Sequence, residues 1–309
     1  MRRPAAVALL LAWSSLSTPA LAWNAAGHRL SASIAWEHLS PPARQQVAVL
    51  LESHPDHGRW QGKSKHYAEA EPDFVAFVEA STWADEIRRD PRFEDGEQTT
   101  ATLTGYPDAS RHRDWHYENL PLETRHGQRH LPTQGQLSSR IQQLTRQLGD
   151  PRRRPEERAY ALVWLIHLVG DIHQPLHVVS RLNAAGRPDG GGNDQPVSDP
   201  LNPRRSYTNL HAYWDDLPGP WWLRGKRLQE AALGLQEDTP AHRVRQGAPL
   251  VWREESRSLA RSDVYPETEG EAIPTLDAAY QEKAQDIARR RIAEAGYRLA
   301  RLLNKHLGK

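Results

Sequence analysis

The chain has 309 residues, with 40 basic and 39 acidic side chains and no cysteine. This balance excludes a global basic field that would attract nucleic acid, and the lack of cysteine excludes disulfides and thiolate metal ligands. Any zinc must therefore be held by His, Asp and main-chain groups. The eleven tryptophans predict a Trp-rich core and leave a few rings for stacking on a base.

The first 22 residues have the three parts of a secretory signal peptide. Two arginines follow the initial Met, the apolar stretch 5–13 comes next, and the sequence Pro-Ala-Leu-Ala ends at Ala22. The apolar stretch is too short to span a bilayer. We therefore expect cleavage between Ala22 and Trp23 and export to the periplasm or the medium, without stable membrane association. An uncleaved anchor is the alternative.

Residues 23–309 predict one all-α domain with long loops and a long C-terminal helix. No run of alternating apolar and polar residues is long enough for a substantial sheet. The segment 156–173 is the most apolar and should be central, and Pro175 should end it. Ser40 should cap the second helix. The expected helices span 28–39, 43–51, 73–89, 137–148, 156–173, 207–217 and 275–306, and the expected long loops span 90–113 and 186–205.

A His and an Asp lie four residues apart in the central apolar helix, at His167 and Asp171. Residues at this spacing project from one face of a helix. Burying both among Leu, Val and Ile is unfavourable unless they bind something. Metal coordination would satisfy them, but a simple buried His–Asp hydrogen bond explains the pair equally well.

The same spacing recurs at His211 and Asp215, on another predicted helix. Two such pairs in one chain favour metal coordination over an exposed helical His. Between the two pairs, Pro175 ends the apolar helix and His177 follows outside it. His173 lies off the common face, so we interpret it as a core residue or as a group that supports the ligands.

Weaker signals come from Asp85 and His116, each close to a Trp, where ordinary packing with a solvated charge is the alternative. The expected new N-terminus at Trp23 precedes His28 by five residues. An α-amine has a lower pKa than the Lys side chain, so it loses its proton to a metal more readily. The amine nitrogen and carbonyl oxygen of one residue can then chelate the metal in a five-membered ring. A frayed terminus is the alternative. The Gly-rich segment 190–194 is interpreted as a flexible surface loop.

The order of these motifs resembles the zinc-dependent single-strand-specific nucleases of the S1/P1 type, whose fold is related to that of the zinc phospholipases C. The resemblance covers essentially the whole mature chain. It begins at Trp-Asn-Ala-Ala-Gly-His28 and includes Trp-Ala-Asp85, Trp-His116-Tyr and Gly-Gly-Asn-Asp194. The segment Ile-His-Leu-Val-Gly-Asp-Ile-His-Gln-Pro-Leu-His177 is its most specific part.

The resemblance implies three Zn²⁺ ions per chain. It makes Asp171 a bridge between two of them and gives the third the amine and carbonyl of Trp23. The implied ligands are Asp85, His116, His167 and Asp171 for the first ion, His177, His211 and Asp215 for the second, and Trp23, His28 and Asp171 for the third.

The implied reaction is endonucleolytic hydrolysis of single-stranded DNA and RNA to 5′-phosphorylated products. Zinc-activated hydroxide would attack phosphorus, with Asp85 as the catalytic base. Release of phosphate from 3′-nucleotides is a further implied activity. Fungal members commonly have disulfides, so a chain without Cys suggests a bacterial-type member. After Asp215, where a polar base-contacting residue is expected, this chain has Asp216 and Leu217. Arg125 matches an active-site Lys of the family only loosely.

We expect a monomer. Two alternatives keep the ligands and change the function. A phospholipase C-like lipid phosphodiesterase should have an apolar surface for membrane contact. A non-catalytic zinc-binding protein would more often use a flexible His-rich tract.

Overall fold

The computed structural model describes residues 23–96, 103–122, 133–182, 186–202, 207–267 and 272–308. Helices dominate this part of the chain, so the predicted all-α fold is confirmed. The helices are α1 (Ala25–Glu37), α2 (Pro41–Glu52), α3 (His57–Gln61), α4 (Pro72–Ala80), α5 (Trp83–Glu86), α6 (Leu137–Gly149), α7 (Pro155–Asp171), α8 (Leu210–Asp216), α9 (Gly225–Asp238), α10 (Pro249–Leu259) and α11 (Ala278–Leu307).

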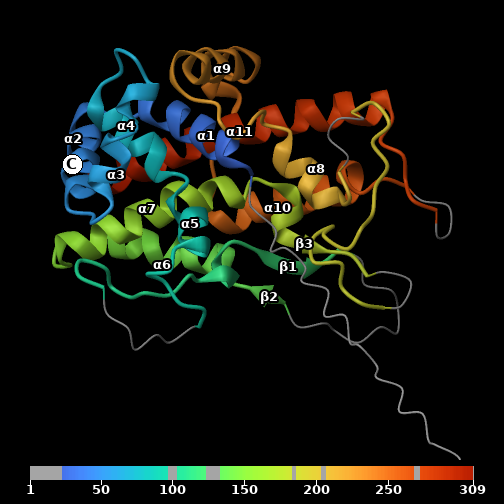
Figure 1. Cartoon of the computed structure of the whole chain (residues 1–309), viewed down its shortest axis with the longest axis horizontal. Helices are drawn as coiled ribbons and strands as arrows, with labels where there is room; N and C mark the ends of the chain where they lie inside the picture. Colours follow the sequence, from blue (N-terminus) through green and yellow to red (C-terminus); the bar gives the residue numbers. More distant parts are fainter. Residues whose placement is uncertain are drawn as a thin grey trace, which may run out of the picture.

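Helix α7 runs through the middle of the molecule, as the sequence predicted (Figure 1). Every residue from Ala159 to Asp171 is buried, because α7 packs against α1, α2, α5, α6 and α11. A helix covered on all sides needs apolar residues on all sides, which explains its composition. It ends at Asp171, and Pro175 begins a separate 3₁₀ turn.

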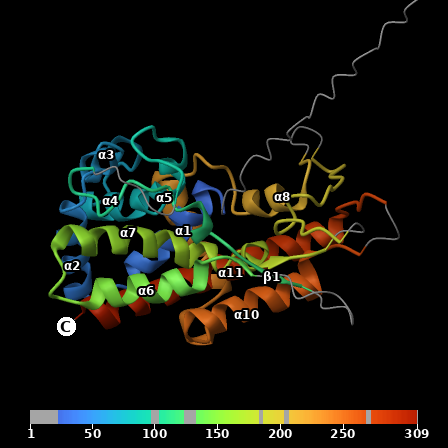
Figure 2. The ribbon, with the colours of Figure 1, turned by 90° about the horizontal axis from the view of Figure 1, so that it is seen from below.

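Helix α1 packs along both α11 and α7, and glycines allow the close approach (Figure 2). A Cβ atom added to Gly296 of α11 would lie 2.7 Å from Cβ of Ile34. A Cβ atom added to Gly170 of α7 would lie 2.8 Å from Nδ1 of His28. Both distances are shorter than carbon contacts allow, so α1 can lie at this depth only above glycine. The packing places His28 directly over α7.

A small sheet joins two segments that follow predicted ligands. Its strands are β1 (Glu118–Pro121), β2 (Gln134–Gly135) and β3 (Val179–Ser180), in the order β2-β1-β3. Strand β1 is antiparallel to β2 and parallel to β3. Since His116 precedes β1 and His177 precedes β3, the parallel pairing holds these two imidazoles close together.

The predicted continuous helix 73–89 is wrong. Helix α4 ends at Ala80, and Ser81 and Thr82 separate it from α5. Their hydroxyl groups donate hydrogen bonds to carbonyls of α4, at 2.6 and 3.0 Å. Such bonds compete with the helical ladder. The break turns the start of α5, which carries Asp85, toward α7.

Other element boundaries differ by a few residues. Helix α2 begins after Ser40, whose hydroxyl accepts from a backbone N–H as predicted. Helix α8 starts at Leu210 rather than at 207, because Asn209 caps it, and Asp277 similarly caps α11. Helices α3, α9 and α10 were not predicted.

Parts of the sequence predictions fall on residues outside the described ranges. The expected signal peptide 1–22, residues 97–102 of one expected loop and residues 203–205 of the other are among them. Arg125 is another. Among the helices that the structure does describe, none is long and apolar enough to cross a bilayer.

Candidate metal centre

All eight side chains that the sequence suggested as ligands come together beside α7. They form three groups, and within each group one ligand atom per residue lies within 4.8 Å of the others. His167 belongs to the first two groups, and the third is joined to them where Nδ1 of His177 lies 2.7 Å from the carbonyl oxygen of His116. The groups are His28, Asp85 and His167; His116, His167 and Asp171; and His177, His211 and Asp215.

Asp171 lies between imidazoles on both sides. Its Oδ2 is 3.1 Å from Nδ1 of His116 and 3.3 Å from Nε2 of His167. Its Oδ1 is 3.4 Å from Nε2 of His28. Oδ1 of Asp85 approaches the same ring nitrogens of His116 and His167 at 3.9 and 3.8 Å. The two oxygens of Asp171 therefore face different imidazoles, so this carboxylate could serve both neighbouring groups if they held metal ions.

Three of the imidazoles are fixed in one tautomer by the backbone. His167, His177 and His211 each place Nδ1 at 2.7 Å from a carbonyl oxygen. A carbonyl only accepts, so Nδ1 carries a proton and Nε2 is the ring nitrogen that faces the cluster. Metal-bound histidines are oriented in this way by their surroundings. The accepting carbonyls belong to Ser81, His116 and Gly191, respectively.

The interpretation of residues 190–194 as a flexible surface loop is wrong for Gly191 and Gly192. Gly191 and Gly192 are buried. A Cβ atom on Gly191 would lie 2.3 Å from the carbonyl oxygen of Leu176, and the φ angle of Gly191 is +70°. Only glycine combines this left-handed backbone with such a close approach. The segment is therefore packed against α8, where it orients His211.

Several buried atoms of the cluster have no hydrogen bond to any described residue. They are Oδ1 of Asp85, Nε2 of His116, Oδ1 of Asp171 and both ring nitrogens of His28. Each such group left unsatisfied destabilises the fold by about 1–3 kcal/mol. Divalent cations would satisfy them, and a set of imidazole and carboxylate donors without thiolate suits zinc. The residues present therefore fit the implied metals.

The charges in the cluster are also unbalanced. Burial lowers the pKa of His28 and of His116, and neighbouring imidazoles and Arg88 add to the effect, so both rings stay neutral. Burial raises the pKa of Asp171 to about 6 and raises that of Asp215 well above its ordinary value. A bound divalent cation would reverse both carboxylate shifts, because it favours the ionised form.

Two residues that support the cluster were not identified from the sequence. Nε2 of Gln174 donates to Oδ1 of Asp215 at 2.8 Å. The sequence had indicated only a helix end at this position. Arg88 is buried three residues after Asp85, and its Nε lies 3.6 Å from Oδ1 of Asp85. The i, i+3 spacing in a helical segment was the available signal.

His173 belongs to the core and not to the cluster. Its Nδ1 donates to the carbonyl of Val169 at 2.7 Å, and its Nε2 lies 2.8 Å from Nη1 of Arg298 on α11. Trp23 is buried at the start of α1. The backbone N–H of Asn24 donates to the carbonyl of Asp215 at 2.9 Å, which anchors this end of the chain to the helix that carries two of the ligands.

A helical fold that buries groups of His and Asp side chains able to hold metal ions is the pattern of a metal-dependent hydrolase. Residues 23–308 match the S1/P1 nuclease family, and the chain belongs to this family. Nuclease P1 of Penicillium citrinum is 24% identical over 307 residues, covering 92% of this chain and 97% of that protein. Nuclease PA3 of a Penicillium species has the same identity and coverage.

Proposed function

We propose that the mature chain, residues 23–309, is an exported, monomeric, three-zinc endonuclease that hydrolyses single-stranded DNA and RNA to 5′-phosphorylated products. It also releases phosphate from 3′-nucleotides. The observation that carries this proposal is the cluster around Asp171, where buried nitrogen and oxygen atoms lack partners and backbone carbonyls fix the imidazoles with Nε2 facing inward. Membership of a nuclease family supports the substrate class.

The zinc ligands of the proposal are those that the resemblance implies. Asp85, His116, His167 and Asp171 hold one ion, His177, His211 and Asp215 hold the second, and the Trp23 backbone, His28 and Asp171 hold the third. When bound, zinc supplies Lewis-acid stabilisation of the phosphate charge and makes water more acidic.

Asp85 is the group that can exchange a proton with water. Its side chain is 17% exposed, whereas His167 and Asp171 are fully buried. Its Oδ1 has no hydrogen bond among the described groups, so it can accept the proton of an attacking water. Nε of Arg88 lies 3.6 Å from Oδ1 of Asp85, so the guanidinium orients this carboxylate. Gln174 orients Asp215 by donating a hydrogen bond from Nε2 to Oδ1 at 2.8 Å.

The N-terminal amine of Trp23 becomes available only after cleavage. The family match begins at residue 23, which supports the proposed cleavage site. We predict that a protein with an additional N-terminal Met before Trp23 loses most of its activity and binds fewer than three zinc ions. Full activity of the extended protein would refute the amine as a ligand. The measurement is zinc content together with the rate of DNA cleavage, with the correctly processed protein as control.

The decisive experiment compares single-stranded DNA, RNA and phosphatidylcholine as substrates of the processed protein, before and after chelation. Cleavage of nucleic acid that chelation abolishes, without lipid turnover, is the expected result. Trp221 and Trp222 are both exposed, and exposed tryptophans suit lipid contact as well as base stacking, so the lipid arm is informative. Lipid turnover alone would refute the nuclease and retain the metal centre. Metal binding without any turnover would leave a zinc-binding protein.

A further inference from the structure

A cavity lies among α6, α10 and α11. Figure 2 shows these helices on the other side of α7 from α5 and α8, the helices of Asp85, His211 and Asp215. The cavity is formed by α6, α11, the start of α10 and the segment before α10, and its volume is about 600 Å³. This volume is within the range of small-molecule sites, about 300–1,000 Å³. We call it the α6–α11 pocket.

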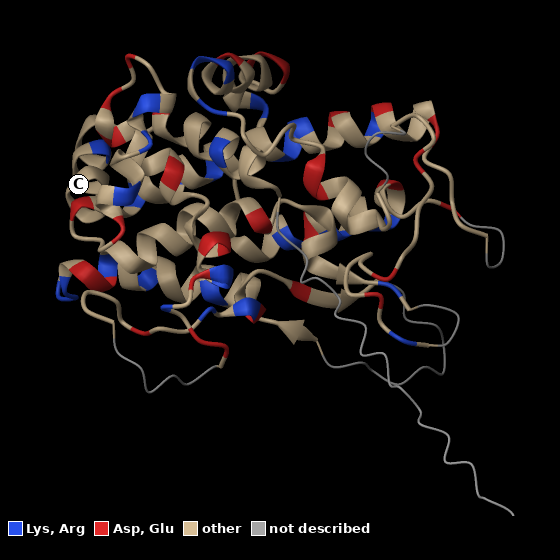
Figure 3. Cartoon of the chain, viewed as in Figure 1, with Lys and Arg blue, Asp and Glu red and all other residues tan. Residues whose placement is uncertain are grey.

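The lining of the α6–α11 pocket is basic. Arg146 comes from α6, and Arg301, Lys305 and His306 come from α11. No Asp or Glu lines it within the described ranges. Elsewhere on the ribbon, acidic and basic residues are interspersed, as the near-zero net charge requires (Figure 3). A cavity whose charged lining residues are all cationic therefore differs from the mixed charge of the rest of the molecule.

Three of these cations lack a counter-charge. Arg146, Arg301 and Lys305 make no ion pair or hydrogen bond with any residue that the structure describes. Arg298, which also lines the pocket, is different, because its Nη1 lies 2.6 Å from Oε2 of Glu255. A lone cation in the last turn of a helix stabilises that turn. Here the last turns of α6 and α11 converge on one cavity, where like charges repel unless an anion binds.

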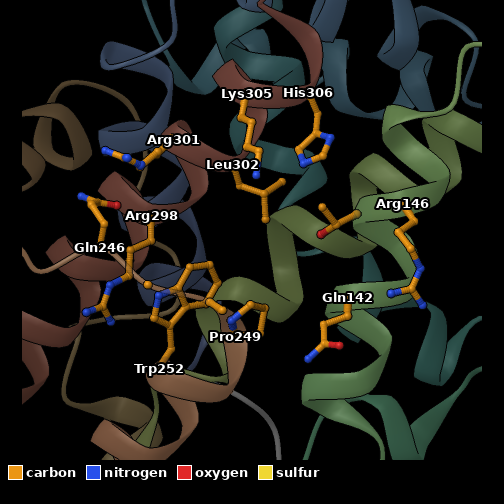
Figure 4. Close-up of a pocket in the computed structure, with 13 residues that line it drawn as sticks. Gln142, Arg146, Gln246, Pro249, Trp252, Arg298, Arg301, Leu302, Lys305 and His306 are labelled. Carbon is orange, nitrogen blue, oxygen red and sulfur yellow. The ribbon is translucent and has the colours of Figure 1, made fainter.

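The close-up view shows how the pocket is arranged. Lys305 and His306 point from α11 into the space between α6 and α11, and Pro249 and Trp252 lie at its floor (Figure 4). The N-terminus of α10 contributes to this floor, and its N-cap residue Ala248 provides no side-chain acceptor. Pro249 has no backbone N–H to donate to an anion, so the preference of the pocket for anions rests on its charged side chains.

We propose that the α6–α11 pocket binds a phosphate group, carried by a mononucleotide or present as free phosphate. Lys305 points into the space between the helices, and Arg146 and Arg301 border it, so the pocket offers cationic donors to a phosphate monoester, which has close to two negative charges and several acceptor oxygens. The site is separate from the metal centre, and a phosphate ligand would occupy it whether or not the metal centre cleaves nucleic acid. The proposal thus does not rest on the proposed function.

Trp252 supplies a local probe for the test. Its indole Nε1 is buried and lacks a hydrogen bond among the described residues, and Gly247, another lining residue, lies beside it. In ¹H–¹⁵N spectra of the metal-loaded processed protein, the Trp252 indole resonance is assigned by its loss in Trp252→Phe. Inorganic phosphate and 5′-AMP are then titrated separately. We expect both to shift this resonance, and tighter binding of 5′-AMP would assign the nucleotide as the source.

The decisive variant is Arg146→Gln combined with Lys305→Gln, which removes one charge from each wall. Both side chains are exposed, so folding should be retained. The apparent dissociation constant should increase by roughly tenfold or more. The matched control is Lys65→Gln combined with Arg227→Gln, two exposed cations outside the pocket, and it should titrate like the wild type. No shift in the wild type, or an equal shift in the decisive variant, would overturn the proposal.

Discussion

Two buried carboxylates on neighbouring helices have opposite environments. Glu79 of α4 accepts hydrogen bonds on Oε1 from Arg29, Arg224 and Tyr67, at 3.0, 2.7 and 2.5 Å. Asp171 of α7 is equally buried, but imidazoles face it and its Oδ1 has no hydrogen bond among the described residues. Protein donors satisfy the hydrogen-bonding capacity of Glu79, whereas Oδ1 of Asp171 is left without a donor among the described residues.

The pKa values of the two groups differ accordingly. Burial acts to raise both. At Glu79, the hydrogen bond from Arg224 and the charge of Arg29 outweigh burial and lower the pKa. At Asp171, burial dominates and raises the pKa to about 6. Burial of a carboxylate therefore does not by itself indicate a metal site. The indication is a buried carboxylate whose neighbours leave donor and acceptor atoms unused.

The largest effect is expected from Asp171→Asn. If this carboxylate bridges two ions, the variant loses both together, and activity falls by more than about 100-fold, since even residues behind the ligands contribute 10- to 100-fold. Metal analysis and the cleavage rate are the measurements. Glu230→Gln on the surface of α9 is the control, with wild-type values expected. Three zinc ions retained in Asp171→Asn would contradict the bridging assignment.

Glu79→Gln should mainly affect stability. It leaves the buried charge of Arg29 without its carboxylate, and breaking a buried ion pair destabilises a protein by about 3–5 kcal/mol. The measurement is the free energy of unfolding in denaturant. Glu230→Gln breaks only an exposed pair with Lys226, so it should change stability by less than about 1 kcal/mol. A change this small in Glu79→Gln would show that the buried ion pair between Glu79 and Arg29 does not stabilise the fold.

Gly191→Ala tests the backbone support of His211. The new methyl group would collide with the carbonyl of Leu176, 2.3 Å away, and displace the carbonyl that fixes the imidazole. We expect metal affinity at the His177, His211 and Asp215 group to fall by about 10- to 100-fold. Gly186 has a similar φ angle, +71°, but open space around it, so the Gly186→Ala variant should retain its metal affinity. Equal losses in both variants would point to backbone strain instead.

The smallest expected effect is on how the free energy of unfolding depends on pH, in protein from which a chelator has removed the metal. The raised pKa of Asp171 means that the folded state binds more protons than the unfolded state between about pH 4 and 6. Its contribution to stability therefore falls as pH rises through this range. The lowered pKa of Glu79 acts in the opposite direction, since its contribution is lost as pH falls. Unfolding measured from pH 4 to 7 should show opposite changes of slope in Asp171→Asn and Glu79→Gln, and parallel changes would contradict the comparison.

Local sequence determined much of this protein. The apolar run of α7, the caps at Ser40 and Asp277, and the His-x3-Asp spacings at 167–171 and 211–215 depend on residues within one or two turns. The apolar run and the His-x3-Asp spacings sufficed to predict the central helix and four side chains of the cluster, at His167, Asp171, His211 and Asp215. The other four side chains were implied by the resemblance. The resemblance to a known family used the same local motifs.

Other features depend on contacts between distant segments. Helices α9 and α10 were missed because few of their positions are buried, and the core that covers those positions comes from elsewhere in the chain. The carbonyls of Ser81 and Gly191 orient histidines 86 and 20 residues away. A sequence pattern specifies which groups share a helix face, but only tertiary packing decides which carbonyl, cation or glycine meets them. For that reason the satisfied Glu79 and the unsatisfied Asp171 are distinguishable only in the folded chain.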